Sequence, residues 1–342
     1  MARVPTGLRN VAILLLIWEI AGRMDLVASG ALPGFSEILI RLWEDRADYP
    51  RHIWATLYAS GVGFLIGNAI ALMAGVAFAM SPTLLRLFRG VNIAVFALPP
   101  IAIAPILVLT LSGMAPRIVL AALAVYFVTM TATVIGISQS DSRASDLVKA
   151  YGGGRWRILW LVQLRSALPT IITGFQIAAP NAVLGAILAE FGGGGRWGLG
   201  TYLLGSLGRG EPDRLWGIGL IATAIAGLGY LFFALISRRL IGATRAVTLN
   251  TATPIGEAVS TSPLKRTMML IGIVSLPFLL WWAFIVLTGV PAMIGKTPFG
   301  VIDYLFFAKT APVAQEKLFQ ALSETLPMTF AGMAAGIGFA FL

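Results

Sequence analysis

The sequence predicts an all-α membrane protein, from its composition and from the spacing of its apolar residues. Of the 342 residues 58% are hydrophobic and only 12% are charged, and the mean hydropathy is +0.86. A soluble domain is typically about 25% charged. The apolar residues also come in blocks of roughly 20, the length at which a helix crosses about 30 Å of hydrocarbon. Because backbone groups in hydrocarbon must be hydrogen-bonded within their own segment, each block is expected to be a helix.

Eight apolar blocks are the candidate membrane spans. The first follows Arg3 and Arg9 as a secretory signal would, but Trp18-Glu19 interrupts it and no small-residue cleavage site follows cleanly, so we interpret it as a membrane helix. The spans are expected near Leu8–Leu26, Ala55–Met80, Phe88–Leu111, Arg117–Gln139, Ala167–Glu190, Arg214–Ser237, Thr267–Thr288 and from Leu318 to at least Leu342.

The basic residues predict the orientation, because cytoplasmic loops carry an excess of Lys and Arg. With the amino terminus in the cytoplasm, 14 of the 25 Lys and Arg lie in inner segments, whereas only Asp141, Asp146 and Glu257 of the 15 acids do. We therefore expect a cytoplasmic amino terminus. The basic residues counted are Arg3, Arg9, Arg86, Arg89, Arg143, Lys149, Arg155, Arg157, Arg165, Arg238, Arg239, Arg245, Lys265 and Arg266.

Several function classes find little support in the composition. The chain has no cysteine, which excludes disulfides and thiolate metal sites. His52 is the only histidine, and we interpret it as a solvated loop side chain rather than a ligand or a base. The net charge of +10 comes from residues in the gaps between spans, without the interleaved stacking aromatics typical of a nucleic-acid interface. We therefore expect the lipid bilayer, and no nucleic acid, as a partner.

The chain also repeats itself, which indicates a tandem duplication. Each copy begins with a Trp-containing helix, continues with an outer segment that starts at a Pro turn, and ends in a Gly-rich helix. We expect a complete six-helix unit at residues 1–245, a polar cytoplasmic linker at 246–263, and the first two helices of a second unit at 264–342. The matching positions are Trp18 with Trp281, residues 35–39 with 298–302, Thr56-Leu57 with Thr325-Leu326, and Gly67 with Gly336.

The segment between the fourth and fifth spans, residues 141–169, is the most informative stretch. It is too long for a tight link and too amphipathic for a disordered one. Asp141 or Ser145 is expected to cap a short helix whose first turn contains Asp146. Gly152 to Gly154 then allows the chain to turn, and a second short helix is expected from Arg155, with Pro169 marking entry into the fifth span.

This segment resembles the cytoplasmic loop of ABC importer permeases, which reads Glu-Ala-Ala, three residues, Gly, and a Leu-Pro some 16 residues later. Here the acidic position is Asp146, the glycine is Gly152 and the Leu-Pro is Leu168-Pro169, while Leu147-Val148 stand in place of the two alanines. The closest group imports aliphatic sulfonates, taurine, nitrate and thiamine precursors. Further matches lie at Trp18-Glu19, Leu32-Pro33, Ser36-Glu37, Leu98-Pro99-Pro100, Arg155-Trp156 and Gly198-Leu199-Gly200, so that the resemblance covers Leu8 to Arg245 and resumes at Leu264.

The resemblance implies a permease subunit in a bacterial inner membrane, with no catalysis of its own. A separate ABC ATPase would use ATP and Mg²⁺, a periplasmic binding protein would deliver the solute, and a second permease unit would complete the pathway. The loop would form the coupling helix that docks in the ATPase. The coupling residues implied are Asp146, Leu147, Lys149, Ala150, Tyr151, Gly152, Gly153, Arg155, Trp156, Leu168 and Pro169.

The physics of the loop agrees with docking, since small and apolar residues on one face flanked by basic ones suit a partner's groove. The alternative is an amphipathic helix resting on anionic headgroups, which has no need of the spacing from acid to Gly to Leu-Pro.

Two motifs resemble nucleotide-binding sequences and are set aside. Gly193 to Gly198 satisfies GxGxxG but follows no strand, and is interpreted as a flexible or re-entrant turn; Gly289 to Thr297 has the wrong glycine spacing for a phosphate loop.

Polar and proline residues within the spans are candidates for the translocation pathway. Leu98-Pro99-Pro100 and Pro105 break the third span where an open backbone requires protein or water, although a static kink would serve as well. Gln176, Asn181 and Asn68 either face the pathway or make interhelical hydrogen bonds. Glu19 and Glu190 lie near outer ends of spans and are expected to reach water. We thus predict Asn68, Pro99, Pro100, Gln176 and Asn181 as possible pathway residues, with no catalytic or metal site and no cofactor.

The leading hypothesis is an ATP-driven importer of a small polar or anionic solute. A membrane-embedded enzyme is one alternative, but the spans lack a paired-carboxylate, His-rich or Ser-His arrangement. An ion-coupled secondary transporter, with which the repeat is compatible, is the other. ATPase dependence discriminates it, since the loop is expected only where a motor docks, and ion coupling would be expected to use ionisable residues near the middle of the membrane. Because an importer needs two permease units, and the second repeat is still apolar at Leu342, we expect either a longer fused permease or pairing with another chain.

Overall fold

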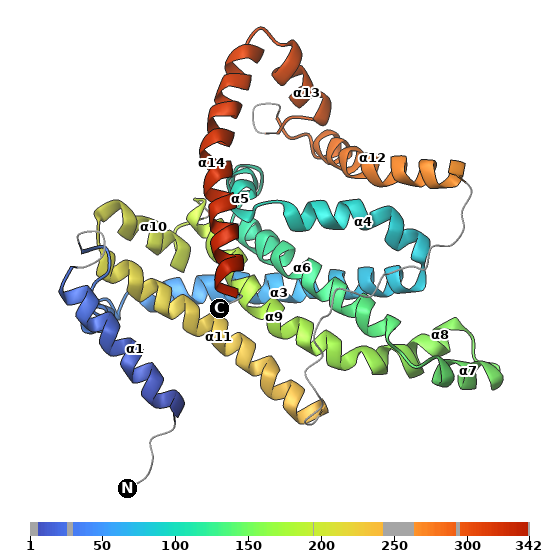
Figure 1. Cartoon of the computed structure of the whole chain (residues 1–342), viewed down its shortest axis with the longest axis horizontal. Helices are drawn as coiled ribbons and strands as arrows, with labels where there is room; N and C mark the ends of the chain where they lie inside the picture. Colours follow the sequence, from blue (N-terminus) through green and yellow to red (C-terminus); the bar gives the residue numbers. More distant parts are fainter. Residues whose placement is uncertain (1–5, 26–29, 194, 242–262, 292–294, 341–342) are drawn as a thin grey trace. The chain divides into compact units, whose positions relative to one another are not determined.

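The computed structural model describes residues 6–25, 30–193, 195–241, 263–291 and 295–340, and is helical throughout them apart from short turns (Figure 1). It divides into two compact units, Met1–Ile273 and Val274–Leu342. Most of the expected linker at 246–263 lies outside the described residues, which resume at residue 263.

The first unit contains eleven helices in the residues described and the start of a twelfth. Several short elements separate its long helices. In chain order they are α1 (Thr6–Arg23), α2 (Phe35–Glu44), α3 (Tyr49–Met80), α4 (Pro82–Ala97), α5 (Pro100–Thr110), α6 (Ala115–Ser138), α7 (Ser142–Ala150), α8 (Arg155–Ile158), the π-helical turn η2 (Leu159–Gln163), α9 (Leu164–Phe191), α10 (Leu199–Arg209), α11 (Pro212–Ile241) and the first part of α12 (Pro263–Thr288).

Among the described residues, five helices are long and apolar enough to cross a membrane, or six if α4 and α5 count as one broken span. The five are Tyr49–Met80, Ala115–Ser138, Arg155–Phe191, Pro212–Leu240 and Thr267–Leu287. α1 and α14 (Ala311–Ala340) occupy the positions of the first and eighth expected spans but are not among these five.

Prolines affect two spans: Pro99-Pro100 break the third span as predicted, although Pro105 lies inside α5, and the predicted role of Pro169 is wrong. The third span is two helices that meet at 91°, because Leu98 and Pro99 are extended, with ψ angles of 120° and 119°, ahead of prolines that disfavour helix. Pro169, in contrast, does not begin the fifth span. It lies inside α9, in a continuous helical run from Arg155 to Phe191, as prolines can within membrane helices.

Small residues bring three long helices of the first unit into backbone contact, with α6 between α3 and α9. A Cβ added at Gly63 or Gly67 of α3 would collide with the α6 backbone, 2.7 Å from Ile118 O and 2.6 Å from Ala122 O respectively. From α9, a Cβ at Gly185 would lie 2.8 Å from Leu120 O on α6. Such close approach is how helices associate in lipid, where no hydrophobic driving force acts between them.

Two polar residues predicted to be in water are buried instead. His52 is 7% exposed because α3 begins at Tyr49, six residues before the expected start of the span, and carries His52 into the bundle. Glu190 is fully buried, and its carboxylate accepts hydrogen bonds from Thr56 Oγ1 and Gly200 N, both at 2.9 Å. Thr56 lies 134 residues from Glu190 in the chain, and Gly198, which contacts His52, lies 146 residues from it.

Ion pairs join the carboxyl end of α2 to the start of α11. Arg214 contacts Asp45 through two bonds, of 2.5 and 2.9 Å, and Arg41 Nε lies 3.1 Å from the same carboxylate. Glu211, between α10 and α11, also contacts both Arg209 and Arg214. The hydrogen bond from Arg209, with the charge of Arg214, holds the pKa of Glu211 below its ordinary value.

The second unit contains the rest of α12, a short helix α13 (Pro298–Ile302) that continues as the π-helical turn η3 (Asp303–Phe307), and α14. Thr297 caps α13, with its hydroxyl accepting from Gly300 N. On α14 only Ala311 and Ala314 are buried among the residues described. Most of the α14 surface is therefore exposed.

The packing of α3 on α6 predicts different effects for one change at two glycines of α3. Gly67→Ala should lower the free energy of unfolding by about 1–3 kcal/mol, because the new methyl overpacks against Val125 and Ala122. Gly61→Ala should be neutral or raise it by up to about 1 kcal/mol, since a Cβ there meets nothing within 4 Å and alanine favours helix. Unfolding of the purified variants in detergent measures both, and equal effects would contradict the packing account.

Candidate functional site

The segment from Asp141 to Gln163 forms a helical hairpin at one end of α6 and α9 (Figure 1). The Asp141 carboxylate caps α7 by accepting from Arg143 N at 2.8 Å, as one of the two expected caps. Asp146 was expected in the first turn of the helix, but it follows the first turn, because α7 begins at Ser142. Asp146 instead pairs with Lys149 at 2.9 Å on the surface, a contact typically worth less than about 1 kcal/mol.

A glycine turn connects α7 to α8. Gly152 has a φ of +75°, which favours glycine over any other residue. Gly153 N donates to Val148 O at 2.8 Å, and a Cβ at Gly153 would clash with the Val148 backbone. The Arg155 guanidinium then donates to Met80 O at the end of α3. The hairpin is therefore tied to the bundle at its base.

The hairpin exposes large apolar side chains. Leu147 is 60%, Tyr151 82% and Trp156 65% exposed, and no residue of α7 is buried. Trp160 and Leu161 of η2, which were not predicted as coupling residues, are also exposed. Exposed apolar clusters of this kind mark contact with another protein or with a membrane.

The coupling residues predicted from the sequence do not all lie together. Those from Asp146 to Trp156 lie in the hairpin, whose basic residues are Arg143, Lys149, Arg155 and Arg157. Leu168 and Pro169 lie inside α9, beyond η2, and Leu168 is exposed. The Leu-Pro pair therefore belongs to the helix that follows the hairpin.

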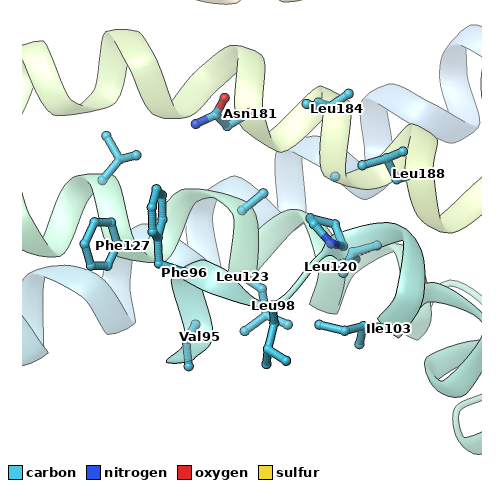
Figure 2. Close-up of a pocket in the computed structure, with 14 residues that line it drawn as sticks. Val95, Phe96, Leu98, Ile103, Leu120, Leu123, Phe127, Asn181, Leu184 and Leu188 are labelled. Atoms are coloured by element: carbon cyan, nitrogen blue, oxygen red, sulfur yellow. The ribbon is translucent and has the colours of Figure 1, made fainter. Parts of the chain in front are cut away.

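A cavity of about 240 Å³ lies beside the break between α4 and α5 (Figure 2). Its lining comes from α4, α5, α6 and α9, and includes Phe96 stacked on Phe127 with ring centroids 4.4 Å apart. Pro100 and Asn181 both line it, and Asn181 supplies the only polar side chain among the 14 lining residues (Figure 2). The cavity is thus apolar with a single amide.

The other predicted pathway residues lie elsewhere. Asn68 is buried between α3 and α6, where it accepts from Thr129 Oγ1 and donates to Phe64 O, so its contacts are interhelical and local hydrogen bonds. Gln176 is half-buried on α9, and Pro99 is exposed at the break, without lining the cavity. In the described part of the chain, no group of three or more acidic or histidine residues is placed to hold a metal ion.

Comparison with known proteins identifies the family. Residues 67–245, more than half of the chain, match the binding-protein-dependent transport system inner membrane component, and the chain belongs to this family. A probable ABC transporter permease protein of Haemophilus influenzae is 28% identical over 66% of this chain and 91% of its own length. A putative aliphatic sulfonates transport permease protein of Bacillus subtilis is 25% identical, over 69% and 86% respectively. The taurine transport system permease protein of Escherichia coli is 26% identical, over 51% and 66%.

The protein is therefore a multi-pass inner-membrane permease component of an ABC transporter that imports small solutes. Membership confirms the resemblance found in the loop and implies an ATPase and a binding protein as partners. Permeases of this family are not enzymes and bind no cofactor of their own, so ATP hydrolysis belongs to another subunit. The ion-coupled transporter and the membrane enzyme are thereby set aside.

The turn at Gly152 predicts a contrast with Gly154, two residues later. Gly152→Ala should cost about 1–2 kcal/mol, because alanine is disfavoured at positive φ. Gly154, with φ −78° and open space around it, should accept alanine without such a cost. Hydrogen exchange of the Gly153 amide should be faster in the first variant and unchanged in the second; equal protection in both would contradict the role of the turn.

Proposed function

We propose that the hairpin formed by α7, α8 and η2 is the surface on which the ATPase docks. Its support is the exposure of Leu147, Tyr151 and Trp156 on an element anchored through Arg155 to the end of α3. A helix whose apolar face lies in a partner's groove needs such exposed anchors. The tie to α3, and the direct continuation into α9, give the hairpin a mechanical connection to the long helices.

We further propose that the translocated solute passes beside the break between α4 and α5, where Pro100 and Asn181 line the cavity. This lining carries no charge, which supports the view that solute selection is left mainly to the binding protein. Related permeases are named as transporters of aliphatic sulfonates, formylaminopyrimidine, riboflavin, carnitine and taurine. A small polar or anionic solute is therefore the proposed substrate class. The other residues predicted for the pathway, Pro99, Asn68 and Gln176, do not line this cavity.

The orientation follows from the docking proposal. With the hairpin in the cytoplasm, the amino terminus also lies in the cytoplasm, in agreement with the distribution of basic residues. Residues 1–245 then form a complete permease unit, the linker at 246–263 is cytoplasmic, and a second permease repeat begins at residue 264.

Residues 264–342 are proposed to be the start of a second permease repeat. The order of α12, α13 with η3, and α14 is that of α1, α2 and α3. At a shift of 269 residues, Thr325, Gly332 and Gly336 of α14 correspond to Thr56, Gly63 and Gly67 of α3, the face on which α3 contacts α6 and Glu190. A second permease unit, in the same longer chain or in another copy, would complete the transporter.

The docking proposal predicts that Tyr151 is an anchor for the ATPase. Tyr151→Ala should weaken binding of the purified ATPase subunit to the permease in nanodiscs by at least tenfold, since truncation of an interface aromatic commonly costs about 2 kcal/mol. Tyr58→Ala is the matched control, because Tyr58 is also exposed but lies on α3. It should change the affinity less than twofold.

Unchanged affinity in Tyr151→Ala, with normal membrane insertion, would contradict docking at the hairpin. It would favour the alternative in which the hairpin rests on lipid headgroups.

A further inference from the structure

Two arginines and a tryptophan form an exposed cluster at the end of α6 and α9 opposite the hairpin. The guanidinium carbons of Arg51 and Arg196 lie 5.4 and 5.1 Å from the centre of the Trp197 ring, within range of a cation–π interaction. Both arginines are exposed, and Trp197 is 38% exposed. We call Arg51, Arg196 and Trp197 the Trp197 platform.

Arg196 and Trp197 belong to a glycine-rich segment that Glu190 holds in place, and Arg51 lies on α3. The carboxylate of Glu190 accepts from Gly200 N and from Thr56 Oγ1, and Thr56 Oγ1 accepts in turn from Leu199 N at 2.9 Å. A side chain at Gly198 would collide with this carboxylate. The first amides of α10 are thus satisfied by side chains of α3 and α9.

Arg117 and His52 complete the attachment. Arg117 Nη1 lies 3.8 Å from Glu190 Oε1 and donates to Trp197 O at 2.7 Å, so a buried ion pair holds the backbone of the exposed tryptophan. His52 Nδ1 lies 2.7 Å from Gly198 O and 3.1 Å from Gly198 N, and its ring makes an edge contact with Trp197 at 5.3 Å. Burying the Arg117–Glu190 ion pair costs desolvation energy. Its structural effect is to fix the segment that contains Trp197.

Most other arginines at this end of the unit are paired with a carboxylate, with the exception of Arg46, which lies over Trp43 and makes no ion pair among the described residues. Arg41, Arg209 and Arg214 are each paired with a carboxylate. Within the described part of the chain, Arg51 and Arg196 make no ion pair. Two positive charges are therefore presented to the outside on a backbone that is held rigidly. Preorganisation of this kind lowers the entropic cost of binding a partner.

We propose that the Trp197 platform receives acidic side chains of the solute-binding protein. This rests on the proposed function. Figure 1 shows α7 and α8 at one end of α6 and α9 and α10 near the other, and Arg196 and Trp197 directly precede α10. With the hairpin in the cytoplasm, the platform therefore faces the binding protein. The chemistry required of the partner is a pair of carboxylates, which complement the two guanidiniums. A small solute would need a concave site, and no platform residue lines the cavity beside the break between α4 and α5.

A lipid contact accounts less well for the same residues. Tryptophan and arginine are common at membrane interfaces, but such anchoring requires no fixed backbone. The platform, in contrast, is attached through Glu190, Thr56, Arg117 and His52. Anionic headgroups are retained as an outcome of the test.

The test is a binding measurement between the full chain and the purified binding protein of its transport system, without the ATPase. The chain is placed in nanodiscs of phosphatidylcholine alone, so that no anionic lipid is present. The double variant Arg51→Glu/Arg196→Glu should weaken binding at least tenfold, mainly through slower association, and should flatten the salt dependence seen with the wild type. Both positions are exposed, and unchanged binding of the ATPase subunit reports that the variant is folded.

Arg46→Glu is the matched control, because Arg46 is an exposed arginine that lies 4.7 Å from the ring centre of another exposed tryptophan, Trp43. It should change the affinity less than twofold. Unchanged affinity in the double variant would overturn the proposal, as would equal weakening by Arg46→Glu, which would indicate a general charge effect. A binding defect that appears only in discs with anionic lipid would overturn it in favour of headgroups. The Tyr151 measurement concerns the ATPase alone, so its failure is distinguishable from failure here.

Discussion

Backbone contact of α6 with both α3 and α9 is the constraint on which the rest of the first unit depends. Gly63 and Gly67 allow α3 to pack directly against the backbone of α6. Gly185 allows α9 to do the same. Because these contacts leave no room for a methyl group, the three helices have one register. That register determines which residues meet at their two ends, far from the glycines themselves.

The two ends are built differently. At one end the chain between α6 and α9 leaves the bundle as a hairpin with exposed apolar residues, fastened by Arg155 to the end of α3. At the other end the same helices close around a buried carboxylate, and Glu190, Thr56 and Arg117 fix the segment before α10. A permease must contact a motor on one side and a binding protein on the other, and each end offers one exposed surface on a fixed base. Between them, the break at Leu98-Pro99 opens an apolar cavity beside α6 and α9.

Much of this architecture is predictable from local sequence. α3, α6, α9 and α11 are continuous apolar runs of spanning length, so their existence follows from hydropathy. The turn at Gly152 follows from three consecutive glycines, and the break of the third span from Pro99-Pro100. Even so, the 91° angle of that break depends on packing and has no signature in the sequence.

The errors arose where a side chain depends on a distant partner. Glu190 was placed in water because a carboxylate near the end of a span ordinarily reaches it, yet its hydroxyl partner Thr56 lies 134 residues away. His52 was placed in a loop because its neighbours are polar, whereas its partner Gly198 lies 146 residues away. The Gly198-Leu199-Gly200 motif was a usable signal, since glycines of that kind mark a backbone that another group approaches closely.

The most direct test of the whole account is the sidedness of the two ends, which the absence of native cysteine makes simple to measure. Single cysteines at Lys149 and at Arg196, both exposed, would be treated in spheroplasts with a membrane-impermeant maleimide. The account predicts that Arg196→Cys is labelled in intact spheroplasts and Lys149→Cys only after the membrane is permeabilised. Labelling of Lys149→Cys from outside would contradict the orientation, the ATPase docking surface and the assignment of the opposite end to the binding protein.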